Sequence, residues 1–129
     1  MQAEMGTVLL ALALFALKHF LADFVLQPSW MTRGKGQYGH PGGFAHAAVH
    51  MAGSLPALIV LGAGPLAALL LILAEGVVHY HIDWTKETLT RRFAPDIRRA
   101  GYWVLLGADQ LLHQLTYLAM VALLVVRIG

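Results

Sequence analysis

Four long apolar stretches, separated by short polar or glycine-rich segments, account for most of the chain. They cover approximately residues 6–27, 42–61, 65–85 and 102–128, and each is close to the roughly 20 residues that a helix needs to cross a bilayer. Pro28 ends the first stretch, and a glycine-rich turn before Pro65 separates the second from the third. The pattern predicts an all-α integral membrane four-helix bundle, forming a single transmembrane domain over residues 1–129.

The two longer connections differ in character. Residues 30–41 are rich in glycine and proline and predict a loop. Residues 86–101 are polar and basic, with Phe93 and Ile97 spaced to lie against the membrane interface, so we expect a short amphipathic helix or an ordered loop. Because no basic residue precedes the first stretch and no small-residue cleavage site follows it, we expect a retained span rather than a secretory signal.

Composition agrees with a membrane protein. The chain is 58% hydrophobic and 12% charged, whereas soluble chains carry about 25% charged residues. The absence of cysteine excludes disulfides and thiolate metal sites. A net charge of only +2, with the basic residues gathered in loops, argues against a nucleic-acid partner.

The distribution of charge predicts an orientation. The two connections that share one side of the membrane hold most of the basic residues: Arg33, Lys35, Lys86, Arg91, Arg92, Arg98 and Arg99. By the positive-inside rule these loops are cytoplasmic and both termini lie outside. The aromatic residues expected in an interfacial belt fall near the same side: Trp30, Tyr38, Tyr80, Trp84, Tyr102 and Trp103.

Each apolar stretch carries one pair of ionisable residues four positions apart, a spacing that places both on one face of a helix. The pairs are His19 with Asp23, His46 with His50, His79 with Asp83, and Asp109 with His113. Random placement of the histidines and aspartates would give roughly one such pair. All four pairs are expected at a similar depth, in the cytoplasmic half of the bundle, where they would meet.

Such a cluster requires partners, because a charge at the bilayer centre costs about 2.5–3.5 kcal/mol and neighbouring carboxylates repel each other. Neutral histidine and ionised aspartate are good ligands for divalent metals. The eight donors predict two ions, with zinc as the first choice and manganese or iron as alternatives: His19, Asp23, His46, His50, His79, Asp83, Asp109 and His113. We expect three glutamines to orient the imidazoles: Gln27, Gln110 and Gln114.

Three further polar residues in the apolar stretches have open roles. Lys18 would snorkel to the interface, balance the carboxylates or contact a substrate. Glu75 would be either a ligand or a neutralised group inside the bundle. His81 points away from the face of His79 and Asp83, so we expect it at the interface, with substitution for one of the ligands as the alternative.

The order of these motifs also resembles a family of small four-span bacterial membrane proteins known only as a domain of unknown function. The resemblance extends over nearly the whole chain and rests on His19-x3-Asp23-Phe24-x2-Gln27 with Met31 and Lys35, then His46-x3-His50, His79-x3-Asp83-x2-Lys86 and Asp109-Gln110-x2-His113. It implies a location in a bacterial inner membrane and no particular activity. A looser likeness, to bacterial inner-membrane metal-dependent hydrolases, is an analogy of architecture.

The residues favour a membrane-embedded di-metal hydrolase that acts on a lipid or lipid-linked ester or phosphoester at the cytoplasmic leaflet. Asp23 or Asp109 would bridge the ions or act as the base, and Lys18, Lys86 and the basic loops would hold a phosphate head group. Alternatives are a divalent cation or proton transporter or channel, built with a homo-oligomer, and a di-iron oxidoreductase. A bis-histidine haem protein and a polar network that only stabilises the bundle also stay open.

Overall fold

The computed structural model describes residues 5–128 and confirms the all-α class. Four long helices dominate it: α1 (Met5–Phe20), α3 (Pro41–Val60), α4 (Pro65–Phe93) and α5 (Ala100–Ile128). A π-helical segment, η1 (Leu21–Val25), continues α1, and a short helix, α2 (Ser29–Gly34), lies in the first connection.

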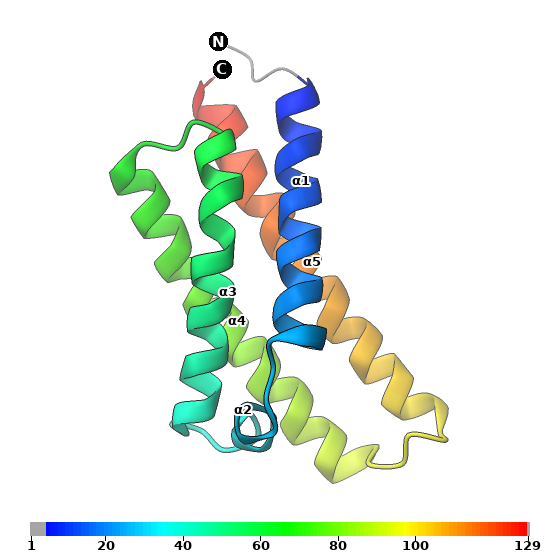
Figure 1. Cartoon of the computed structure of the whole chain (residues 1–129). Coiled ribbons are helices and arrows are strands. Elements are labelled where there is room, and N and C mark those ends of the chain that lie inside the picture. The colour runs from blue at the N-terminus through cyan, green and yellow to red at the C-terminus, as the bar shows by residue number, and fades with distance from the viewer. Residues whose placement is uncertain (1–4, 129) are drawn as a thin grey trace.

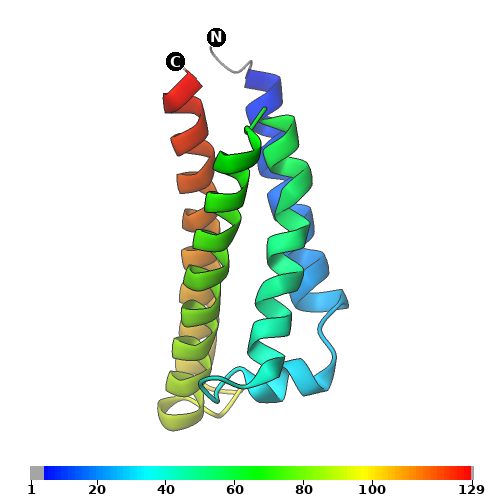
Figure 2. The same ribbon diagram turned by 90° about the vertical axis from the view of Figure 1, so that its left-hand side faces the viewer.

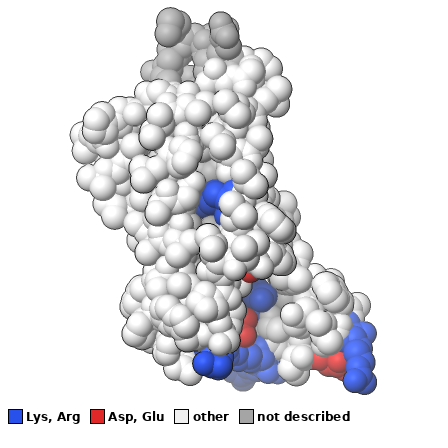
Figure 3. All heavy atoms as spheres, viewed as in Figure 1, with Lys and Arg blue, Asp and Glu red and all other residues white. Residues whose placement is uncertain are grey.

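The long helices form a ring in which α1 packs against α3 and α5, and α4 also packs against α3 and α5 (Figures 1 and 2). The α3–α4 turn lies at the end of the bundle where α1 begins and α5 ends. The helix α2 and the α4–α5 connection lie at the opposite end (Figure 1). The visible Lys, Arg, Asp and Glu side chains gather mostly at this second end, which we call the polar end (Figure 3).

Four segments are long and apolar enough to cross a membrane: Met5–Val25, Pro41–Val60, Pro65–Phe93 and Ala100–Val126. Their outward faces carry large apolar side chains, such as Leu9, Ile59 and Val104, that are more than half exposed. A surface of this kind is stable against lipid and not in water. The chain is therefore a multi-pass membrane protein.

An apolar core fills the half of the bundle nearest the termini. Phe15 of α1 stacks on Tyr117 of α5 with ring centroids 5.0 Å apart. Ala11 and Ala57 are fully buried, and such small residues let membrane helices approach closely. This core leaves the polar side chains of the spans to collect between it and the polar end.

Both long connections contain more helix than the sequence pattern predicts. The separate amphipathic helix expected within residues 86–101 is wrong, because α4 continues to Phe93, and the alternative of a loop applies only to residues 94–99. The helix stops just before Pro95, whose ring disfavours helix in the residue preceding it. Likewise, α2 begins directly after Pro28 within a segment expected to be loop. The first span changes to π-helix at Leu21, where the Leu26 amide donates to the Leu21 carbonyl at 2.7 Å.

Candidate metal centre

The four sequence pairs converge between the apolar core and the polar end. His46 and His50 of α3 are fully buried, and His79 of α4 and His113 of α5 are each 1% exposed. Asp23 comes from η1, and the π-helical turn carries it into the same cluster. One level of the bundle therefore holds imidazoles and carboxylates from every long helix.

Asp23 is the first of two carboxylates around which the histidines gather. Its Oδ1 atom lies 2.8 Å from Nε2 of His50 and 3.1 Å from Nε2 of His46. Its Oδ2 atom lies 3.2 Å from Nε2 of His19. Asp23 thus joins α1 and its π-helical extension to α3.

Asp83 is the second carboxylate around which the histidines gather. Its Oδ2 atom lies 3.3 Å from Nε2 of both His46 and His79, and its Oδ1 atom lies 3.1 Å from Nε2 of His113. The ammonium group of Lys35, from the segment after α2, approaches Oδ2 to 3.1 Å. Because His46 contacts both carboxylates, the two clusters form one continuous site.

Ligand atoms from six of these side chains form two groups, in each of which the atoms lie within 4.8 Å of one another. The groups are Asp23, His46, His50 and His79, and then His79, Asp83 and His113. Donors about 2.1 Å from a tetrahedral ion would lie roughly 3.4 Å apart, so small side-chain movements would close either group around a metal. His79 belongs to both.

The buried polar atoms of the cluster also fit a bound cation. Among the described residues, the Nδ1 atoms of His46 and His79 are buried without a hydrogen-bond partner, and their Nε2 atoms and the Oδ1 atom of Asp109 have contacts of 3.1–3.3 Å with ionisable groups but no hydrogen bond. Such orphaned groups are costly and rare in folded proteins. With neutral imidazoles, the three carboxylates of Asp23, Asp83 and Asp109 outnumber the two lysines that lie on the same side of the cluster, Lys35 and Lys86, so an excess of negative charge is left for a divalent ion to offset.

The other two predicted ligands lie beside these groups. His19 is hydrogen bonded through both ring nitrogens, to the Tyr117 hydroxyl at 2.9 Å and to Oε1 of Gln110 at 2.8 Å. Asp109 approaches Nε2 of His113 to 3.3 Å and accepts a hydrogen bond from the Gln110 amide at 3.1 Å. His19 and Asp109 therefore contact the cluster from its edge.

Of the three glutamines expected to orient imidazoles, only Gln110 contacts one. Gln27 instead donates to the backbone oxygen of Asp23 at 2.7 Å, because the π-helical turn brings that carbonyl within reach. Gln114 is exposed on the outer face of α5, since it follows the inward-facing His113 by one position. The prediction was wrong for Gln27 and Gln114.

Lys18 and Glu75 form a buried ion pair on the apolar side of the cluster. Lys18 Nζ lies 2.5 Å from Oε1 of Glu75, donates to the backbone oxygen of His50 at 3.2 Å, and sits 4.4 Å from the centre of the Tyr117 ring. Lys18 therefore neutralises an anion instead of snorkelling. Glu75 is absent from both ligand groups.

A small cavity of about 90 Å³ adjoins the cluster on the side of the polar end. Asp23, Asp83 and Asp109 line it together with Lys35 and Lys86. At roughly 30 Å³ per water, it has room for a few waters or a small polar group. Figure 3 shows acidic and basic atoms within a crevice at this end of the molecule.

The sequence prediction did not include Tyr117, and it placed Lys35 only in a basic loop and not beside Asp83. Tyr117 continues the stripe of Asp109 and His113 by a further four residues, so helical spacing would have identified it. Lys35 gave no comparable signal, because its approach to Asp83 depends on how α2 folds back over the bundle. His81 lies outside the cluster, with Nδ1 2.7 Å from the Val77 carbonyl.

The chain belongs to the family described as protein of unknown function DUF3307, whose model matches residues 10–128. The match includes all the residues of the cluster. No curated protein and no solved structure matches the chain.

Proposed function

We propose that this protein is a membrane-embedded, metal-dependent hydrolase with two divalent ions, acting on a lipid or lipid-linked ester or phosphoester. One ion would be held by Asp23, His46 and His50, and the other by Asp83 and His113, with His79 within reach of both. Nitrogen and oxygen donors without thiolates suit zinc, and manganese or iron would also fit. The observation that carries the proposal is the buried, anionic His/Asp cluster with unpartnered ring nitrogens beside a polar cavity.

A divalent ion in this cluster would make a bound water nucleophilic at neutral pH and offset charge on the substrate oxygens. In hydrolysis, the water oxygen would attack the ester carbon or phosphorus, and the bond to the leaving oxygen would break. Asp109 lines the cavity, and its buried Oδ1 atom makes no hydrogen bond, with only Nε2 of His113 near it at 3.3 Å. It would therefore accept the proton from water and return it to the leaving oxygen, a role that Asp23 could also take.

The cavity favours an anionic substrate from the side of the polar end. Lys35 and Lys86 line it and would contact a phosphate or carboxylate oxygen. Because the basic loops are at this end, the positive-inside rule assigns it to the cytoplasmic face of a bacterial inner membrane, with both termini outside.

A transporter is the competing function, since buried His/Asp sets also form ion pathways. The apolar core opposes it, because Phe15, Leu58 and Tyr117 fill the bundle between the cluster and the far end. A path for a divalent ion would have to cross this core or form between copies of the chain. The hydrolase needs no such path.

The test uses the full chain purified in detergent, loaded with zinc and reconstituted with the total lipid extract of the producing cells. Lipid mass spectrometry should show one lipid class converted to its hydrolysis product. Asp109→Asn should slow this conversion about 10²–10⁴-fold, the usual contribution of a general base. Asp96→Asn is the matched control, because Asp96 is an exposed aspartate in the connection between α4 and α5, away from the cluster and its cavity.

A metal-loaded protein that leaves every lipid intact would overturn the hydrolase. Zinc uptake into proteoliposomes by that same preparation would assign the cluster to transport. An absorption band from oxo-bridged iron in the protein as isolated would favour the oxidoreductase.

A further inference from the structure

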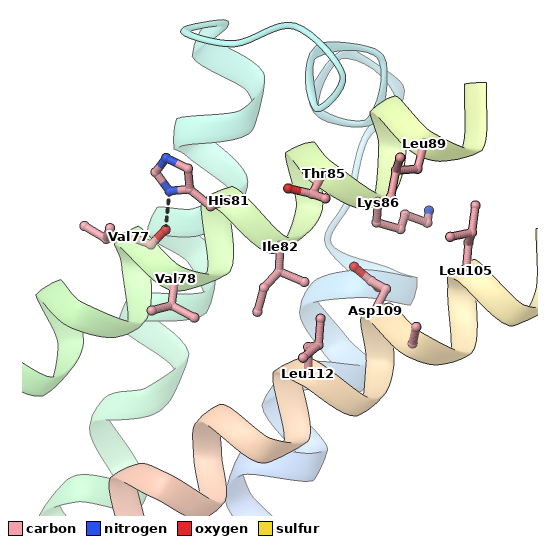
Figure 4. A pocket seen from close by; sticks show the side chains of 11 residues that line it. Val77, Val78, His81, Ile82, Thr85, Lys86, Leu89, Leu105, Asp109 and Leu112 are labelled. Atoms are coloured by element: carbon pink, nitrogen blue, oxygen red, sulfur yellow. Dashed lines mark hydrogen bonds between the residues drawn. The ribbon is translucent and has the colours of Figure 1, made fainter. Parts of the chain in front are cut away.

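An apolar groove runs between α4 and α5 on the outer surface of the bundle. Its volume is about 440 Å³. Val78 and Ile82 of α4 face Leu105 and Leu112 of α5 across it (Figure 4). Because both helices are membrane-spanning segments, this groove opens toward the hydrocarbon of the bilayer.

The groove leads to the candidate metal centre. Lys86 and Asp109 line both the groove and the small polar cavity beside the cluster. Figure 4 shows both side chains directed into the space between α4 and α5. A molecule lying in the groove could thus place one end at the metal centre without leaving the membrane.

The dimensions and charge of the groove suit one lipid chain. From Val77 to Lys86 the helix rises about 14 Å at 1.5 Å per residue, close to the roughly 15 Å of hydrocarbon in one leaflet. Its walls are mostly apolar over this length, with His81 and Thr85 as the polar residues, and Lys86 follows them toward the polar end, where the hydrocarbon would end. An alkyl chain attached to an anionic group matches this order.

We infer that the groove binds one hydrocarbon chain of an anionic membrane lipid, with the ester or phosphate group of that lipid at Lys86 and Asp109. The inference rests on the proposed function and narrows its substrate. The lipid enters sideways from the bilayer, and water reaches the reacting group through the polar cavity. A water-soluble ester would lack the part of the substrate that the groove recognises.

The test is photolabelling of the full chain in nanodiscs, using phosphatidic acid with a diazirine in one acyl chain. Mass spectrometry should locate the label on Val78, Ile82, Leu105 and Leu112. Ala108→Phe would place a ring in the groove and should lower this labelling about tenfold. Ala119→Phe is the matched control, because Ala119 is an exposed alanine of α5 outside the groove.

A second variant tests the headgroup. Lys86→Met should reduce labelling by phosphatidic acid and leave unchanged the labelling by diacylglycerol with the same diazirine chain. Label spread evenly over the exposed faces of all four spans, or labelling that Ala108→Phe does not change, would overturn the inference. A dimer that Ala108→Phe dissociates, with an unlabelled groove, would assign the groove to a second copy of the chain.

Labelling requires binding and not hydrolysis, so the two proposals fail separately. Groove labelling without hydrolysis of any lipid would support lipid binding in the groove and contradict the hydrolase activity. Hydrolysis with evenly spread label would support the hydrolase activity and contradict lipid binding in the groove.

Discussion

The ammonium group of Lys18 on α1 lies 2.5 Å from Oε1 of Glu75 on α4, inside the bundle. The two residues are 57 positions apart in the chain, and both side chains are buried. They join α1 to α4 across the ring of helices, directly beside the apolar core. Since each neutralises the other, the negative charge of the neighbouring aspartates is left for other cations to balance.

Replacing one partner of this ion pair should destabilise the protein more than replacing both. Lys18→Met leaves the Glu75 carboxylate buried without its partner, a change that costs about 3–5 kcal/mol. The double variant Lys18→Met/Glu75→Gln removes both charges and should recover most of that loss. Thermal unfolding in detergent measures the stability of both variants. An equal loss of stability in the single and double variants would contradict a charge-balancing role.

The double variant also tests the catalytic role that the sequence suggests for Lys18. If Lys18 only balances Glu75, the double variant retains bound metal and lipid hydrolysis. Retained metal with lost hydrolysis would support the catalytic role.

Removal of a single histidine from the cluster should lower the metal content. His50→Ala deletes a donor from the group that contains Asp23, and elemental analysis of the purified protein should show the loss of about one ion per chain. His81→Ala removes a histidine of α4 that lies outside the cluster, so its metal content should equal that of the wild type. Equal metal content in all three proteins would contradict the proposed centre.

Alanine substitutions at His79 and His113 should differ in their effect on the number of bound metal ions. His79 belongs to both ligand groups, whereas His113 belongs to one. His79→Ala should therefore weaken the binding of both ions, whereas His113→Ala should chiefly weaken the binding of one. Competitive titration with a zinc-chelating dye compares the two variants, and indistinguishable profiles would indicate that the groups do not share His79.

Helical spacing was sufficient to predict much of this arrangement. Residues such as His46 and His50 lie four apart in an apolar stretch, and an inward face is the only place where lipid tolerates them. The convergence of Asp23 with His50 therefore followed from burying each polar stripe. Because a membrane admits few backbone structures, the apolar pattern alone was enough to predict the fold class.

Other features depend on contacts between segments distant in the chain. The π-helical turn at Leu21–Val25 redirects Gln27 to a backbone carbonyl, and no periodic pattern marks it. Lys35 reaches Asp83 only because α2 folds across the polar end. The pairing of Lys18 with Glu75 required the order of helices around the ring, which four separate apolar stretches do not specify.

The orientation in the membrane is testable because the natural chain has no cysteine. Gly64→Cys places an exposed thiol in the turn between α3 and α4, and Asp96→Cys places one between α4 and α5 without removing a basic residue. A membrane-impermeant maleimide should label Gly64→Cys in intact bacterial cells and Asp96→Cys only after the inner membrane is permeabilised, because the positive-inside rule keeps the basic loops in the cytoplasm. The reverse pattern would place the polar cavity at the outer leaflet, and the lipid substrate would then have to be sought there.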